Sequence, residues 1–186
     1  METAIIIAII SSSLTVIITV VNILLSINQR KKADRLATVT IGRVKYLDKI
    51  RAANAEFAGR TEIHVIKYCA ANPGDKQNYP VDISIAAANL KTFLKPFYKI
   101  EQTIITQIDK LLQVCLSQFV RPDNDFSNEI TKLKTKYDKL YAQYDWSYWR
   151  YIQKQYDGRE LNSDNDFDAV YKKTRSELGC SDYLWE

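Results

Sequence analysis

The chain has 186 residues, 46% of them hydrophobic, and a formal net charge of +4 at neutral pH. It has one histidine, five scattered glycines and no CxxC pair, which argues against a zinc site and excludes glycine-rich phosphate loops. With no catalytic motif present, we do not expect an enzyme, a metal site or a cofactor.

The first predicted element is a long apolar helix. From Ala4 to Ile27 the sequence contains no charged residue and consists mostly of Ile, Val, Leu and Ala. As a helix rising 1.5 Å per residue, this stretch would be about 36 Å long, and a hydrocarbon core is about 30 Å thick. Its acidic start, its length and the lack of a small-residue cleavage site argue against a signal peptide. We therefore expect residues 1–28 to form a transmembrane anchor.

Basic residues follow the apolar stretch at once, namely Arg30, Lys31, Lys32 and Arg35. The positive-inside rule then predicts a single-pass protein of the cell inner membrane, with its N-terminus outside and residues 29–186 in the cytoplasm. Residues 28–67 carry ten Lys or Arg against four Asp or Glu. Such a segment suits anionic lipid headgroups, and an anionic ligand or nucleic acid is the alternative.

Small polar residues interrupt the apolar stretch at regular intervals. The polar seam consists of Ser12, Thr15, Thr19, Asn22 and Ser26, which are spaced by three and four residues as on one heptad face. In lipid, small residues let helices approach closely, and hydroxyl and amide groups hydrogen-bond across the contact. A ring of such helices could instead enclose a narrow water-filled path. In a monomer, the hydroxyls would bond to their own backbone.

The same spacing continues beyond the anchor into a basic juxtamembrane helix, which we expect over residues 34–58. The continued positions are Gln29, Ala33, Leu36, Thr40, Arg43, Leu47 and Ile50. A repeat of 3.5 residues predicts a left-handed bundle if the helices assemble. It also predicts that the anchor and the juxtamembrane helix form one continuous rod.

Three further helical regions follow a predicted loop at residues 72–80, where Pro73, Gly74 and Pro80 occur together. We expect helices at about 82–119, 126–156 and 167–178, with Pro96 causing a kink or break near Leu94. The sequence "DNDF" occurs at 123–126 and at 164–167, and its aspartates are predicted to cap the helices that follow. The predicted fold is therefore all-α: one N-terminal transmembrane helix and an antiparallel cytoplasmic helical bundle at residues 29–186.

The helix at 126–156 contains an aromatic cluster, "YDKLYAQYDWSYWRYIQKQY", at residues 137–156. Its tyrosines recur at three- and four-residue steps, whereas Trp146 and Trp149 fall on a different face, with Arg150 beside them. One interpretation is core packing between rings. The other is a ligand or partner surface formed by Trp146, Trp149 and Arg150.

The stretch "ATVTIGRVKYLDKIRAANAEF", which follows a single span and a basic neck, resembles uncharacterised small bacterial single-span inner-membrane proteins with a cytoplasmic helical domain. The resemblance covers about residues 1–60 and transfers no site residue. Some proteins of this general build are membrane effectors in antiviral defence, and the resemblance implies such a role.

The sequence thus predicts a self-assembling single-pass membrane protein, in the form of a membrane-permeabilising or channel-like effector gated by its cytoplasmic bundle. The alternative is a membrane-anchored adaptor that recruits a protein or nucleotide ligand through the aromatic helix. Expected partners are membrane lipids, further copies of the chain, and a cytoplasmic protein or anionic ligand. Nothing in the sequence points to specific nucleic-acid binding. In a cytoplasmic domain, Cys69, Cys115 and Cys180 should be reduced thiols.

Overall fold

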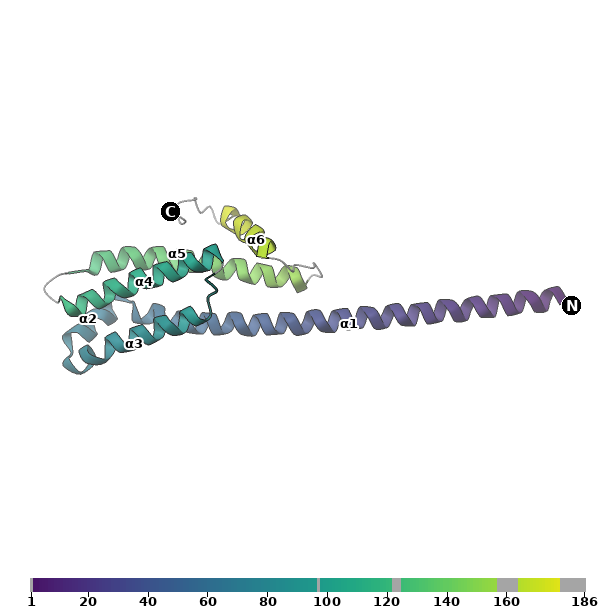
Figure 1. The fold of residues 1–186 in the computed structure, drawn as a ribbon, viewed down its shortest axis with the longest axis horizontal. Coiled ribbons are helices and arrows are strands. Elements are labelled where there is room, and N and C mark those ends of the chain that lie inside the picture. Colours follow the sequence, from purple (N-terminus) through teal and green to yellow (C-terminus); the bar gives the residue numbers. More distant parts are fainter. Residues whose placement is uncertain (1, 97, 122–124, 157–163, 178–186) are drawn as a thin grey trace. The chain divides into compact units, whose positions relative to one another are not determined.

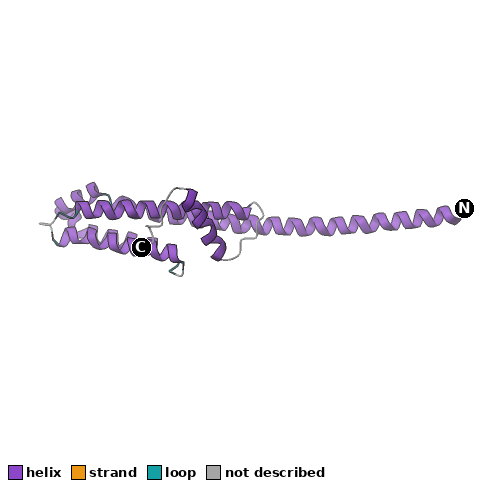
Figure 2. Ribbon diagram, turned by 90° about the horizontal axis from the view of Figure 1, so that it is seen from above, coloured by secondary structure: helices purple, strands orange, loops and turns teal. Residues whose placement is uncertain are grey.

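The computed structural model describes residues 2–96, 98–121, 125–156 and 164–177. Side chains are described from Val16 onward, except for those of residues 35, 73, 155–156, 164–166, 168 and 175. In this described part of the chain all regular secondary structure is α-helical (Figures 1 and 2). The predicted all-α class is confirmed.

Six helices follow one another along the chain: α1 (Glu2–Arg60), α2 (Ile63–Ala71), α3 (Pro73–Thr92), α4 (Lys99–Val120), α5 (Ser127–Tyr156) and α6 (Asp164–Glu177). The helix expected at 34–58 is thus not a separate element but the C-terminal part of α1. The chain divides into two compact units, Met1–Gly42 and Arg43–Glu186, and their boundary falls inside α1.

The second unit is a helical bundle with antiparallel neighbours. Where α5 contacts the part of α1 in this unit, residue numbers rise along α1 as they fall along α5. Arg51 binds Asp145, and Asn54 accepts a hydrogen bond from Tyr137. The pair α3 and α4 behaves in the same way, since Tyr79 stacks on Phe119 and Lys91 binds Asp109. Figure 1 shows α4 and α5 lying side by side, with α6 crossing α5.

The bundle core is built from apolar stripes at helical spacing. The stripe along α4 is buried at Ile100, Ile104, Ile108, Leu111 and Cys115. It packs in one cluster with residues of α1, α3, α5 and α6, among them Phe57, Ile83, Tyr144 and Val170. Burial of these side chains supplies the main driving force for folding of the second unit.

The helical region expected at 82–119 is broken where Pro96 predicts a break. Helix α3 ends at Thr92 and α4 begins at Lys99, which leaves Pro96 in the connection. Proline cannot donate a backbone hydrogen bond, and it restricts the residue before it to extended conformations. From α1, the Tyr46 hydroxyl donates a hydrogen bond to the Phe93 carbonyl at the end of α3. This hydrogen bond satisfies the Phe93 carbonyl, since carbonyl groups at the C-terminal end of a helix have no N–H partner within the helix.

The prediction of a loop at residues 72–80 is wrong. Helix α3 begins at Pro73 and includes Pro80. Pro73 occupies the first turn, where a missing N–H has no cost, and Asn72 before it is extended. Tyr79 is buried, stacks on Phe119 at 4.7 Å between ring centroids and donates to the Arg60 carbonyl. These tertiary contacts outweigh the low helix propensity of the segment.

The helices α5 and α6 begin differently at their two "DNDF" sequences. Before α5, the Asp125 carboxylate accepts a hydrogen bond from the Ser127 backbone N–H, which confirms the predicted cap at this site. At the second sequence, α6 begins at Asp164, so "DNDF" forms the first turn instead of preceding the helix expected at 167–178. Residue 178 lies outside the described residues.

Candidate functional site

The polar seam lies on the first unit, along α1. Thr19, Asn22 and Ser26 are exposed, while the side chains of Ser12 and Thr15 lie outside the described residues. Because these side chains are small, they leave a shallow groove of about 390 Å³ on the helix surface. The groove is lined by Thr19, Asn22, Ile23, Ser26, Ile27 and Arg30. A helix surface of this shape can accept a complementary helix at close range.

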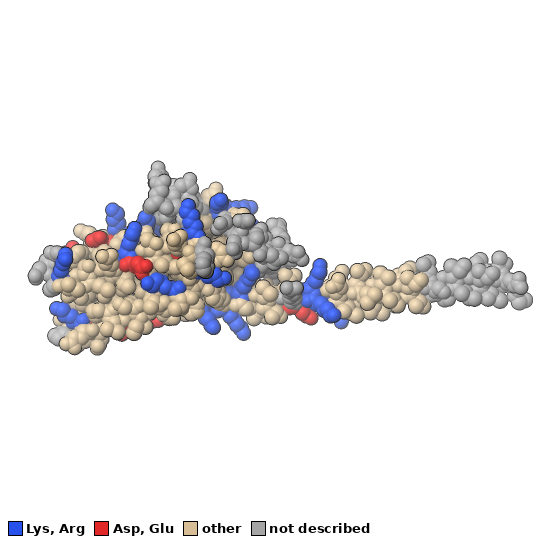
Figure 3. Space-filling view, in the orientation of Figure 1, with Lys and Arg blue, Asp and Glu red and all other residues tan. Residues whose placement is uncertain are grey.

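The rest of the described apolar segment is exposed on every face of α1. From Val16 to Ile27 its large apolar side chains are between 46% and 61% exposed. Figure 3 shows uncharged surface along this segment, followed by a group of basic side chains. Among the residues whose side chains the structure describes, which begin at Val16, no helix contains a stretch long and apolar enough to span a membrane. The transmembrane anchor therefore stays a prediction.

The basic neck follows on the same unit. Arg30, Lys31 and Lys32 are exposed, and the side chain of Arg35 lies outside the described residues. One turn later the Thr38 hydroxyl donates to the Asp34 carbonyl at 2.8 Å, a local bond within the helix. Because their side chains are exposed, Arg30, Lys31 and Lys32 are accessible to an anionic surface or ligand.

The aromatic cluster of α5 has two parts with different environments. Tyr137, Tyr141, Tyr144 and Tyr151 are buried, whereas Trp146 is 52% exposed. Rings of this cluster contact one another and Phe57 and Phe167, with centroid distances of 5.6 to 6.3 Å. Such contacts are typical of edge-to-face and offset packing. These four tyrosines therefore belong to the core, and Trp146 belongs to the surface.

Each of the two tryptophans lies under an arginine. The Arg150 guanidinium is 5.6 Å from the Trp146 ring centroid, and the Arg51 guanidinium is 5.9 Å from that of Trp149. Arg51 is held in place by Asp145, which accepts from its Nε at 2.7 Å and from its Nη2 at 2.9 Å. Trp149 is thereby half-buried. Of the three predicted surface residues, Trp146 and Arg150 come together, and Trp149 pairs with a residue of α1.

The buried carboxylate of Glu101 is a feature that sequence reasoning missed. Its side chain is 4% exposed, and it accepts hydrogen bonds from the Tyr144 hydroxyl at 2.7 Å and from the Lys95 backbone N–H at 2.5 Å. Burial raises the pKa of Glu101, and the two hydrogen bonds oppose that rise. An acidic residue in a first helical turn usually indicates an exposed helix start, so its position gave no warning of burial.

The described residues offer little to nucleophilic or metal chemistry. No group of three or more His, Cys, Asp or Glu among them could hold a metal ion. Cys69 is half-buried and Cys115 is buried, both as free thiols, and Cys180 lies outside the described residues. Burial raises the pKa of Cys115 to about 12, so this thiol is protonated at neutral pH and inert as a nucleophile.

Two features of this geometry thus stand out as candidates, one in each unit. The first is the exposed apolar surface of α1 with its polar seam, and the second is the surface formed by Trp146 and Arg150 on α5. Comparison with known proteins adds no family to this description, since no protein-family model, curated protein or solved structure matches the chain.

Proposed function

We propose that the chain is a self-assembling single-span membrane protein whose apolar segment, residues 4–27, crosses a bilayer. The observation that carries the proposal is the exposed apolar surface of α1 between Val16 and Ile27, with a polar seam along one side. A helix that is apolar all round requires an apolar environment, either a protein core or lipid. The described part of the chain provides no core for this segment.

Length and flanking charge support the same proposal. The 24 residues from Ala4 to Ile27 lie within one continuous helix and reach about 36 Å, against about 30 Å for a hydrocarbon core. Basic side chains at Arg30, Lys31 and Lys32 are exposed directly after it. We expect them to lie at the cytoplasmic headgroups, with residues 29–186 on the cytoplasmic side.

Self-association would give the Asn22 amide a hydrogen-bonding partner. An amide such as that of Asn22 is costly to leave without a hydrogen bond in hydrocarbon, and a second helix can supply the bond. Because the seam repeats every 3.5 residues on average, several copies would pack as a left-handed bundle. Bonds of this kind contribute only about 0.6 kcal/mol each, so the close packing of small residues must supply much of the association energy.

Membrane permeabilisation is the activity that such an assembly would perform. With the seams turned inward, their hydroxyl and amide groups would line a narrow polar path through the bilayer. The bundle would gate the path through α1, whose residues Leu47, Ile50 and Phe57 are fully buried in the second unit. The resemblance to small single-span inner-membrane proteins, some of which are membrane effectors in antiviral defence, is compatible with this activity.

The seam is tested by the native mass of the full-length protein in a mild detergent. We expect a defined oligomer, and we expect Thr19→Leu with Asn22→Leu to dissociate it. Loss of two hydrogen bonds per contact should weaken each contact roughly eightfold. The matched control is Ile17→Leu with Val20→Leu, which changes as many residues of the same helix outside the groove and removes no polar group.

A monomer in all three proteins would overturn self-assembly and with it the permeation pathway. Permeation itself is measured as ion leak from lipid vesicles that contain the protein. Leak is expected from the native protein and from the control variant, and not from the Thr19→Leu, Asn22→Leu variant. An assembled protein that produces no leak would leave assembly in place and contradict the permeation activity.

A second candidate function is a membrane-anchored adaptor, which the exposure of Trp146 favours. An indole that is 52% exposed and lies beside a guanidinium is typical of the anchor residues of protein interfaces. The adaptor needs the second unit at a membrane but not this particular span. Its activity should therefore survive replacement of residues 1–28 by an unrelated anchor, a change that abolishes the activity of an assembling effector.

A further inference from the structure

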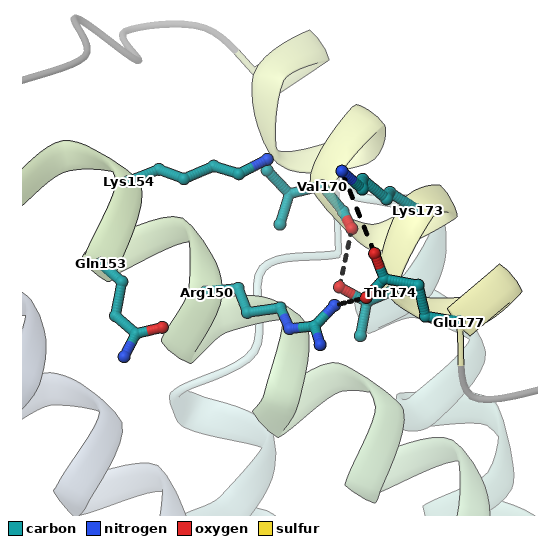
Figure 4. Close-up of a pocket in the computed structure, with 7 residues that line it drawn as sticks. All are labelled: Arg150, Gln153, Lys154, Val170, Lys173, Thr174 and Glu177. Carbon is teal, nitrogen blue, oxygen red and sulfur yellow. Dashed lines mark hydrogen bonds and ion pairs between the residues drawn. The ribbon is translucent and has the colours of Figure 1, made fainter. Parts of the chain in front are cut away.

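A cleft of about 280 Å³ lies between α5 and α6 in the second unit. Its lining residues are Arg150, Gln153, Lys154, Val170, Lys173, Thr174 and Glu177. Figure 4 shows Arg150 and Lys154 extending from α5 toward α6, from which Lys173 and Glu177 come. The cleft is distinct from the polar seam and adjoins the exposed Trp146 through Arg150.

Two cations of the cleft contact the same carboxylate, and a third acts on it through its charge. Arg150 Nη1 donates to Glu177 Oε2, and Lys173 Nζ lies 4.0 Å from Glu177 Oε1 (Figure 4). The hydrogen bond from Arg150 lowers the pKa of Glu177, and the charges of Arg150, Lys173 and Lys154 lower it further. Three cations thus act on the place that one carboxylate occupies.

The positive charge at this place exceeds what Glu177 neutralises. Three cations face one anion, so the lining carries a net charge of +2. In Figure 4 Lys154 extends across the cleft toward α6. Arg150 can present several N–H donors in one plane, of which Glu177 engages one, and its guanidinium also lies over the Trp146 ring. A compact group with more charge and more oxygens than a carboxylate would fit this arrangement better.

We propose that the α5–α6 cleft binds the phosphate group of a small phosphorylated ligand, and that Glu177 occupies the phosphate position until the ligand displaces it. A phosphate offers oxygens for the Arg150 fork and for both lysines at once. The volume is just below the usual range of about 300–1,000 Å³ for small-molecule pockets, which limits the ligand to a small one. The inference goes beyond the proposed membrane function, because it assigns a ligand class to the bundle.

Binding is measured by titrating pyrophosphate into the full-length protein in a non-ionic detergent. The signal is tryptophan fluorescence, since movement of the Arg150 guanidinium toward the ligand changes the surroundings of Trp146. We expect a saturable change that weakens with salt, because ion pairing drives the binding. Trp146→Phe should remove most of the signal and identifies its source.

Substitutions of opposite expected sign test the displacement of Glu177. Glu177→Gln removes the competing carboxylate and should tighten binding roughly fivefold, the size of one unit charge acting across a few ångströms of water. Lys154→Gln with Lys173→Gln removes two unit charges and should weaken pyrophosphate binding roughly twentyfold or more. The matched control is Lys172→Gln, which removes an exposed lysine of α6 that does not line the cleft. Circular dichroism melts show whether each variant is folded. If the double variant is unfolded, the tighter binding expected for Glu177→Gln decides the outcome.

Two probes distinguish a free phosphate compound from a lipid headgroup. Saturable pyrophosphate binding with the expected variant pattern supports the cleft as a site for a soluble ligand. The same pattern seen only with phosphatidic acid in mixed micelles supports it as a headgroup site. The proposal is overturned if neither probe binds, if Glu177→Gln does not tighten binding, or if Lys172→Gln weakens it as much as the double variant does.

Discussion

The two units of the chain use the same apolar residue types in opposite ways. In residues 16–42, none of the described side chains is buried, although Ile, Val and Leu are abundant. In residues 43–186, apolar side chains of the same kinds form a continuous core. The difference lies in their spacing: α4 confines its apolar residues to one face, whereas the first part of α1 carries them all round. One unit buries its apolar residues in a core of its own, and the described part of the other leaves them exposed.

The largest expected difference between the units follows from truncation of one apolar side chain in each. Phe57 is fully buried and packs edge-to-face on Tyr137 at 5.6 Å, so Phe57→Ala should lower the free energy of unfolding by about 3–5 kcal/mol. Ile23→Ala in the first unit is the matched control and should leave the unfolding of the bundle unchanged. Urea titration of the detergent-solubilised protein measures both, and an equal loss in the two variants would contradict the division.

A smaller effect is expected at the buried carboxylate of the second unit. Tyr144 is fully buried and donates its hydroxyl to Glu101, so Tyr144→Phe removes a hydrogen bond to a charged group. The expected loss is about 1.5–3 kcal/mol in the free energy of unfolding. Tyr68→Phe, at an exposed position of α2, is the control and should cost almost nothing. A loss of the same size there would show that the Glu101 contact has no special role.

The pH dependence of stability tests the same carboxylate. Because burial raises the pKa of Glu101, the folded protein keeps this proton to higher pH than the unfolded chain does. The contribution of Glu101 to stability is therefore fully present below the ordinary glutamate pKa and is lost as the pH rises through the raised value. The groups that act on it are Tyr144, the Lys95 N–H and the Lys95 charge.

Glu101→Gln imitates the protonated acid and should flatten this part of the stability profile. The variant should match the native protein at low pH and exceed it in relative stability as the pH rises. The measurement is a series of urea midpoints across the acid to neutral range. Asp109→Asn, at an exposed carboxylate of the same helix, serves as the control and should leave the slope in place. An unchanged slope in Glu101→Gln would mean that the pKa of Glu101 is the same in the folded and unfolded states.

The smallest expected effect is at the Arg51–Asp145 pair on the bundle surface. Both nitrogens of the fork bind the carboxylate, but the Arg51 side chain is 42% exposed, so solvent screens the pair. Arg51→Gln should cost about 1 kcal/mol or less. It should also uncover Trp149 and so increase quenching of its fluorescence by acrylamide. Arg51→Lys keeps the charge but loses the fork, and we expect it to resemble Arg51→Gln more closely than the native protein.

Periodicity predicted the core of the bundle well because burial depends on which face of a helix a residue occupies. The residues from Ile100 to Cys115 that are buried follow helical spacing, and the buried tyrosines of α5 bear out the core-packing interpretation for that face. The turn-forming residues at 72–80 led to the wrong prediction of a loop, because the packing of Tyr79 against Phe119 is a long-range contact that no local pattern reveals. The break at Pro96 was predictable because proline acts through its own covalent geometry.

The candidate sites were predictable to different degrees. The polar seam and the basic neck are patterns along one helix, so the sequence shows them directly. The environment of Trp146 needed the structure, since only the positions of Arg150 and of the core distinguish an exposed indole from a buried one. The α5–α6 cleft brings together residues more than twenty positions apart, such as Arg150 and Glu177, and depends on how α6 crosses α5.

The distribution of aromatic residues has a practical consequence. Residues 1–42 contain no Trp, Tyr or Phe, so all 21 aromatic side chains of the chain belong to the second unit. Near-ultraviolet absorption, fluorescence and circular dichroism of the native protein therefore report on the bundle alone, and the apolar part of α1 is silent in all three. Assembly through the seam and ligand binding in the cleft can therefore be tested in one sample, by native mass for assembly and by tryptophan fluorescence for binding.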